Sequence, residues 1–438
     1  MKKRTIFHPA AWGILSAIVL IHAQEAARPP VVSGYASYEA GQVIKGYGID
    51  GPYDHGWIQK ATIGVGIDAM VASYLRVLVA GEANMGFSFK YNTQFIDQLR
   101  ETQVPKTSFS IMRGEGLFSF SNSRLDSLQI EAGFFPYRTS PDARNLGEFL
   151  LRSTVNPAYI ATTFDRLNSD VLGLRIGHSI RDLFHHDLLL TTEIYQYPMQ
   201  DYSISYLARF NYRRIFELGA GGCLYRFLSI KDYYATPRQS MNIKSLKNPT
   251  SILDSAGNVI GDRYDTTYYS FAGNKIMFRF SFDPKGFFQA PFFGDEDLKL
   301  YGEAALLGTE TDTLYYPALF KRMPIALGFN VPTFKLLDVL AVEMEYWESP
   351  FPNSYQRGFE QGLPLPTTNV SIPGTALKTK WSVYAKRSIG RNCRIIGQVA
   401  RDHLMPISHS LSMGVQDRTD ILLRIDDWWW VLKTSFNF

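Results

Sequence analysis

A long stretch in which apolar and polar side chains alternate constrains this chain more than any other feature. From Leu75 to Phe89 every second residue is apolar or small and uncharged, while Arg76 and Glu82 lie in the other row. Successive side chains of a β-strand point to opposite faces, so the two rows predict a strand with one apolar and one polar face. Ordinary strands run for about five or six residues. A strand of this length suits a tilted strand that crosses a membrane.

The last eleven residues repeat the pattern, with one face made of Trp430, Leu432, Thr434, Phe436 and Phe438. Eleven residues at about 3.4 Å each, tilted by about 40°, rise by roughly 28 Å. This matches an apolar band about 25 Å tall, and it places Trp and Phe side chains at the two membrane interfaces.

The rest of the chain divides in the same way, and the sequence predicts an all-β fold: a transmembrane antiparallel β-barrel of about 16 strands. Fourteen or eighteen strands are the alternatives, because the division near Met199 and Gln200 is the weakest. The predicted strands are 31–40, 61–71, 74–89, 108–121, 127–138, 170–180, 187–198, 201–212, 215–228, 267–283, 298–312, 323–333, 338–349, 378–389, 393–404 and 428–438.

The connections between these strands alternate in length. Those that follow even-numbered strands are mostly short turns, such as 72–73 and 390–392, whereas those that follow odd-numbered strands are mostly long, such as 229–266, 350–377 and 405–427. Short turns at one end and long loops at the other are typical of outer-membrane barrels.

The N-terminus predicts an export signal. Lys2, Lys3 and Arg4 precede an uncharged apolar run from Ala10 to Ile21, and Ala23 offers a cleavage site. The run is too short for a membrane-spanning helix, so residues 1–23 are expected to be a signal peptide and residues 24–438 the barrel, with an uncleaved anchor as the alternative. Without residues 1–23 the chain has 42 basic and 41 acidic residues, so no nucleic-acid-binding surface is predicted.

The combination of a signal peptide, long alternating strands and a terminal Phe438 resembles bacterial outer-membrane β-barrel proteins, and in outline the porins. The resemblance implies location in the bacterial outer membrane, contact with its lipid, and recognition of the C-terminal strand by the barrel assembly machinery. Porin-like barrels are often trimers, so a homotrimer is an expectation from the resemblance alone.

The polar faces of the predicted strands carry many charged residues and point into the barrel. A barrel of sixteen strands is wide enough to hold water, and water inside it accommodates these charges at the least cost in free energy. We therefore expect a porin-like channel for passive diffusion of small polar solutes. The alternatives are a surface or anchor barrel with a closed lumen, for adhesion or complex assembly, and an outer-membrane hydrolase. The expected pore-lining residues are Arg76, Glu82, Arg113, Glu115, Glu131, Arg175, Glu193, Arg209, Glu217, Arg279, Lys299, Glu303, Glu343, Glu345, Lys386 and Lys433.

The third long connection, 139–169, predicts a helix. Ser140, Pro141 and Asp142 form a helix start, and Arg144, Glu148 and Arg152 follow at helical spacing. This loop resembles the third external loop of sixteen-stranded porins, which folds into the lumen and narrows it, so these three charged residues are candidates for a constriction. It lacks a dense acidic cluster, and an ordinary outer loop over the rim is the alternative.

No constellation in the sequence predicts chemistry. His178, His185, His186 and Asp187 could bind a metal ion or supply a general base, but no further ligand spacing accompanies them and a solvated turn explains them better. No nucleophile motif is present, so the chain is not expected to be an enzyme, and no catalytic residue, metal or cofactor is predicted. Four aromatic residues fall in the inward rows and could stack on sugars: Tyr301, Trp347, Tyr384 and Trp429. A better explanation is that they belong to the aromatic girdles at the membrane–water interface and that their strand positions are misassigned by one residue.

Overall fold

The computed structural model describes residues 29–48, 51–87, 106–121, 126–151, 169–192, 201–213, 215–229, 247–256, 258–265, 273–288, 291–309, 319–347, 378–404 and 422–438. The predicted signal peptide, residues 1–23, lies outside these ranges. Everything stated below concerns the described residues.

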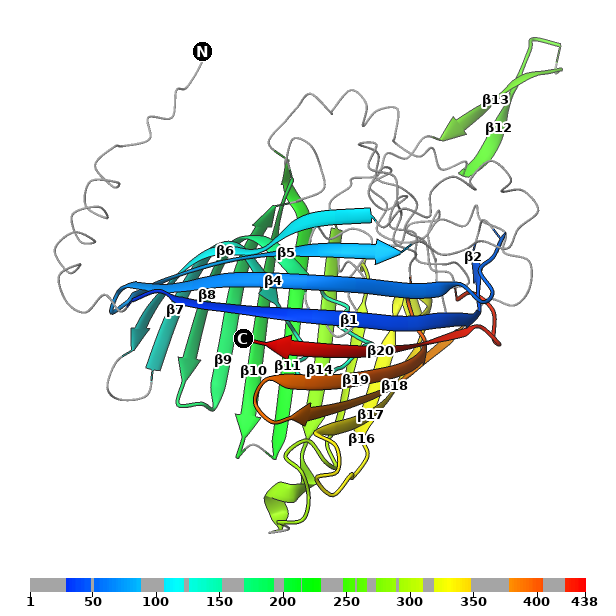
Figure 1. Ribbon diagram of the computed structural model, residues 1–438. Coiled ribbons are helices and arrows are strands. Elements are labelled where there is room, and N and C mark those ends of the chain that lie inside the picture. Colours follow the sequence, from blue (N-terminus) through cyan, green and yellow to red (C-terminus); the bar gives the residue numbers. More distant parts are fainter. Residues whose placement is uncertain are drawn as a thin grey trace, which may run out of the picture.

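Sixteen strands form one closed antiparallel barrel, in which each strand pairs with its neighbours in chain order (Figure 1). The barrel closes where β1 pairs with both β4 and β20. The strands are β1 (Val31–Lys45), β4 (Trp57–Ala72), β5 (Leu75–Phe87), β6 (Lys106–Ser121), β7 (Asp126–Tyr137), β8 (Ser169–Ile180), β9 (Phe184–Thr192), β10 (Asp201–Tyr212), β11 (Phe216–Ser229), β14 (Gly273–Phe282), β15 (Leu300–Leu306), β16 (Ile325–Asn330), β17 (Val339–Tyr346), β18 (Thr379–Ile389), β19 (Cys393–Arg401) and β20 (Trp428–Asn437).

The connections carry a few short elements. Two small hairpins lie between barrel strands, one formed by β2 (Tyr47–Gly48) and β3 (Gly51–Pro52) and the other by β12 (Lys247–Leu253) and β13 (Val259–Asp265). Two 3-10 turns, η2 (Pro284–Phe287) and η3 (Leu319–Arg322), flank β15. Among the described residues, none belongs to a helix that is long and apolar enough to cross a membrane.

The sixteen predicted strands are confirmed, including the uncertain division before Asp201, because β9 pairs with β10 in a regular antiparallel register. Their ends differ at several places. β1 and β4 extend well into the connection predicted at 41–60, which shortens it to residues 46–56. β15 covers only seven residues, less than half of the predicted 298–312.

The alternation of side chains separates an apolar outer face from a polar inner face. On β4 the residues Ile63, Val65 and Ile67 are each about half exposed, as an outer wall requires, whereas Thr62 is buried. A β-bulge at Met112 shifts the register of β6 against β5 and exchanges its two rows. Phe109 and Ile111 therefore face outward before the bulge, and Glu115 is buried after it.

Candidate functional site

Most of the charged side chains predicted to line the inside of the barrel lie in its inner rows and have a partner of opposite charge. In a buried pair, such as Lys433 with Glu39, removal of one member would leave the other charge buried and unpaired, which is costly in free energy. The pairs are Lys433 with Glu39 at 3.1 Å, Arg113 with Glu115 at 2.8 Å, Arg175 with Glu131 at 3.0 Å, Arg76 with Asp68, and Arg279 with Glu217.

The other predicted inner residues have varied surroundings. Glu82 accepts hydrogen bonds from the Tyr35 hydroxyl at 2.5 Å and from Asn84 at 2.8 Å. Glu345 lies 2.6 Å from His403, and Lys386 is half-buried in the inner row of β18. Glu193 lies outside the described residues. Much of the inner charge is therefore matched locally.

The chain that follows β7 turns into the barrel. Residues 138–151, here called the inner segment, contain Leu146, Glu148 and Leu150, each of which is almost completely buried. The segment is held by Glu303 and Glu343, which lie in the middle of β15 and β17. Contacts at mid-strand place the segment inside the barrel and not over its rim.

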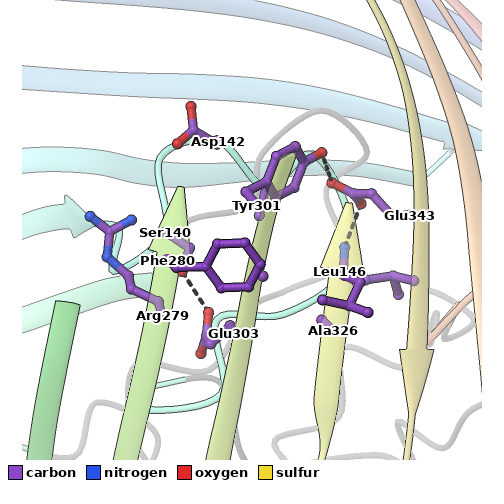
Figure 2. A pocket seen from close by; sticks show the side chains of 12 residues that line it. Ser140, Asp142, Leu146, Arg279, Phe280, Tyr301, Glu303, Ala326 and Glu343 are labelled. Atoms are coloured by element: carbon purple, nitrogen blue, oxygen red, sulfur yellow. Dashed lines mark hydrogen bonds between the residues drawn. The ribbon is translucent and has the colours of Figure 1, made fainter. Parts of the chain in front are cut away.

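Glu343 anchors one bend of the inner segment through its backbone. Its carboxylate accepts hydrogen bonds from three consecutive amides, those of Arg144 at 2.5 Å, Asn145 at 2.8 Å and Leu146 at 2.9 Å. The Tyr301 hydroxyl donates to the same carboxylate at 2.7 Å, as Figure 2 shows. Hydrogen bonds to a charged group are each worth about 1.5–3 kcal/mol, so this carboxylate is a strong anchor.

Glu303 holds the next part of the segment in the same way. It accepts hydrogen bonds from the Ser140 hydroxyl at 2.6 Å and from the amides of Glu148 at 2.9 Å and Phe149 at 2.6 Å. Glu148 in turn folds back and accepts from the amides of Thr139 and Ser140 at 2.8 and 2.6 Å. The three carboxylates together bind seven backbone amides of the inner segment.

The helix predicted at the start of 139–169 is wrong for residues 139–151, which form turns, bends and irregular chain. Gly147 and Glu148 both have positive φ angles, of 98° and 64°, which a right-handed helix excludes. The amides that a helix would bond internally donate to Glu303 and Glu343 on the wall instead. Acceptors distant in sequence therefore outcompete the local helix signals.

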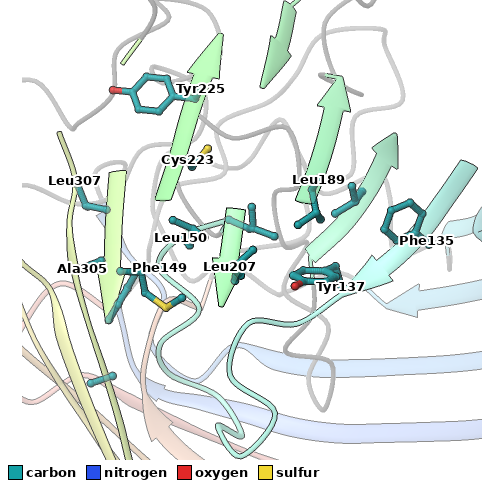
Figure 3. Close-up of a cluster of buried hydrophobic side chains, with 14 residues drawn as sticks. Phe135, Tyr137, Phe149, Leu150, Leu189, Leu207, Cys223, Tyr225, Ala305 and Leu307 are labelled. Carbon is teal, nitrogen blue, oxygen red and sulfur yellow. The ribbon is translucent and has the colours of Figure 1, made fainter. Parts of the chain in front are cut away.

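An apolar contact supports the far end of the inner segment. Phe149, Leu150 and Leu151 are buried among side chains of the wall, which include Leu207 of β10 and Met277 of β14 (Figure 3). The Lys275 ammonium also donates to the Leu150 carbonyl at 3.2 Å. The segment is thus fixed on several sides, by carboxylates and by packing.

The charged residues that the sequence predicts to form a constriction have different surroundings in the structure. Arg144 forms an ion pair with Glu296 at 2.5 Å, and the adjacent Asn145 side chain donates to Asp402 at 2.7 Å. Glu148 is fully buried, and its carboxylate accepts hydrogen bonds from amides of the inner segment itself. Lys299, predicted to line the pore, lies 3.6 Å from Asp142 of the segment. Arg152 lies outside the described residues.

A small cavity remains between the inner segment and the wall, with about 320 Å³ of empty space that includes space open to solvent. Ser140, Asp142 and Leu146 of the segment face Arg279, Tyr301 and Glu303 of the wall across it (Figure 2). Charged residues of both signs, Asp142, Arg279 and Glu303, are among those that line it.

The prediction of a solvated turn at 185–187 is wrong. These residues belong to β9, and Asp187 is 1% exposed on the inner face. Its carboxylate pairs with Arg175 at 2.8 Å and accepts from the Tyr137 hydroxyl at 2.7 Å. The error arose because two consecutive histidines suggest a polar turn, whereas His186 lies on the outer wall beside Phe184 and Tyr206.

The interpretation of three inward aromatic residues also needs correction. Tyr301, Tyr384 and Trp429 are buried inside the barrel, so their interpretation as misassigned interface residues is wrong. Tyr301 bonds to Glu343, and the Trp429 indole donates to Asp402 at 2.8 Å. Their inward alternation was the available signal. Within the described residues no group of three or more metal-ligating side chains is found.

No protein-family model and no curated protein matches the chain. Among solved structures, a three-substitution mutant of the Rhodopseudomonas blastica porin is 9% identical, with a TM-score of 0.43, over 94% of this chain and all of that one. A five-substitution mutant of the same porin is 10% identical, with the same TM-score and coverage. The sixteen-stranded barrel itself rests on the strand pairing described above.

Proposed function

We propose that this protein is a channel of the bacterial outer membrane, through which small polar solutes diffuse passively, and that the inner segment narrows it. The single observation that carries the proposal is the inner segment, tied by Glu303 and Glu343 to the middle of the barrel wall. A chain fixed across the inside of a sixteen-stranded barrel restricts its cross-section without requiring a further domain.

The inner face supports a watery lumen. Charged residues stand on most of the strands around the barrel, and several of them, such as Arg76 and Arg209, keep a substantial part of their side chains exposed. Charges in a dry interior would cost several kcal/mol each unless paired. Contact with water inside the barrel removes that cost for the exposed ones.

The outer face supports a membrane location. Large apolar side chains are exposed around the wall, among them Phe278 at 62% and Met344 at 55%. A surface of this kind is unfavourable in water and suits lipid. With the predicted signal peptide, it favours the outer membrane.

A closed barrel that serves as an anchor or surface protein is the second candidate. The inner ion pairs and the apolar cluster around Leu150, inside the barrel, favour it, because both fill space that a channel would leave open. The two candidates differ in whether solutes cross.

Swelling of vesicles that contain the refolded protein distinguishes them. If the channel proposal holds, neutral sugars enter and the swelling rate falls steeply as the sugar becomes larger. Protein that is folded in the vesicles but admits no sugar of any size would contradict the channel and favour the anchor. Vesicles without protein give the background rate.

A further inference from the structure

An exposed apolar cluster, made mostly of aromatic side chains, lies at the short-turn end of the barrel, below β14 to β16 in the view of Figure 1. It is formed by the β14–β15 and β16–β17 connections, and Phe287 and Leu336 are its most exposed members, at 72% and 76%. We call it the turn cluster, and it consists of Phe287, Phe288, Phe292, Phe293, Phe334 and Leu336. Nothing in the proposed channel requires large apolar side chains at this place.

The turn cluster is firmly built. Phe292 and Phe293 both stack on Phe334, with ring centroids 6.1 and 5.6 Å apart, so the two connections are joined. Beneath the rings, the buried carboxylate of Asp297 accepts from the amides of Gly294, Thr333 and Phe334. The rings are therefore held in an exposed position by hydrogen bonds on the other side.

The cluster continues the outer wall of the barrel. The Phe287 ring lies 6.2 Å from that of Phe282, which stands in the outer row of β14 with the exposed Phe278. Next to Phe282 in register comes Leu300, and next to Leu300 comes Phe329, and both are exposed on the outer face. An unbroken apolar surface thus runs from the wall onto the turns.

The wall above the cluster contains the two shortest strands of the barrel. β16 has six residues and β15 has seven, whereas β4 and β6 have sixteen each. Backbone hydrogen bonds continue the pairing of these two segments beyond the strand ends, from Leu298 with Asn330 at the turn end to Leu307 with Arg322 at the loop end. At the turn end, Phe282, Leu300 and Phe329 lie level in register, so the cluster adds apolar surface directly beyond the ends of these strands.

We propose that the turn cluster inserts into the membrane and continues the lipid-facing surface below β14 to β16, so that its occupant is lipid. Aromatic side chains favour the membrane–water interface, where one face meets acyl chains. The inference rests on the proposed membrane location, and it adds that two ordered turns, and not only strands, contact the bilayer. The proposal also predicts that these two turns contact the bilayer, whereas the other short turns at this end of the barrel lie in water.

Nitroxide labels on single cysteines test the proposal in the full-length protein refolded into phosphatidylcholine vesicles. In a background with Cys223→Ser and Cys393→Ser, labels are placed by Phe287→Cys and Leu336→Cys in the cluster. Leu327→Cys, at an exposed outer position of β16, is the lipid control, and Arg391→Cys, in the turn between β18 and β19 at the same end, is the water control. Each label is read by its collision rates with oxygen, which enriches in lipid, and with a water-soluble nickel chelate.

We expect both cluster labels to resemble Leu327, with frequent oxygen collisions and few nickel collisions. Labels that resemble Arg391 would overturn the proposal and place the cluster in water. Labels that are immobilised and reached by neither reagent would overturn it as well, because a protein surface or a second copy would then cover the cluster. If the label at Leu327 itself met nickel and not oxygen, the proposed membrane location would fail, which is a separate result.

Discussion

At the residue scale, carboxylates decide where the chain goes inside this barrel. Glu303 and Glu343 each satisfy two or more backbone amides of the inner segment, which a helix would have satisfied with its own carbonyl groups. A buried amide without a partner is costly, so the position of the segment depends on these acceptors. The acceptors lie some 150 to 200 residues from the amides they bind, beyond the reach of any local pattern.

Glu343→Gln tests this directly. The amide keeps the shape of the side chain but removes its charge, so the bonds to Arg144, Asn145 and Leu146 lose strength and the segment loosens. We expect a loss of roughly 1–3 kcal/mol in unfolding free energy and a larger or noisier single-channel conductance. Glu345→Gln is the matched control, since Glu345 lies two residues along the same row and its carboxylate lies 2.6 Å from His403. Equal effects of the two variants on conductance would contradict the anchor role.

Asp297, whose carboxylate binds the two connections that carry the turn cluster, is a titrating residue. Burial alone would raise the pKa of the Asp297 carboxyl, but hydrogen bonds from the amides of Gly294, Thr333 and Phe334 outweigh it and lower the pKa. Since the folded-state pKa is the lower one, its stabilisation is present above the unfolded value of about 3.8 and is lost as the pH falls through the folded-state pKa. We expect acid to lower the urea midpoint of unfolding by more in the wild type than in Asp297→Asn. Parallel midpoints for the two proteins across this range would contradict it.

At the scale of elements, the sequence predicts strands well and connections poorly. Every barrel strand separates an apolar outer face from a polar inner face, so a period of two identifies each one locally. The helix signals of Ser140, Pro141 and Asp142 are equally local, but they compete with Glu303 and Glu343 and lose. The bulge at Met112 is likewise fixed by pairing with β5, which no single segment reveals.

Gly133 marks a point where an element depends on one residue. It lies in β7 with a φ of 129°, and an added Cβ would lie 2.2 Å from the Gly114 carbonyl oxygen of β6. Gly133→Ala should therefore lower the unfolding free energy by more than about 1 kcal/mol, because both the backbone and the neighbouring strand must adjust. Gly116→Ala, on β6, meets nothing within 4 Å and is the control. A Gly133→Ala protein as stable as this control would show that β7 tolerates a relaxed backbone there.

At the scale of the whole molecule, the barrel is uneven in height and unevenly filled. Its tall side, β1 to β6, has strands of thirteen to sixteen residues, and its low side, β15 to β17, has six to eight. The inner segment starts after β7 and is anchored on that low side. The central claim of the channel account is that the remaining space conducts ions.

Single-channel recording of the refolded protein in a planar bilayer tests that claim most directly. The account predicts discrete, stable conductance steps that change when Glu343→Gln loosens the inner segment. Silence from protein shown by spectroscopy to be a folded barrel would contradict it and leave a closed anchor barrel as the function.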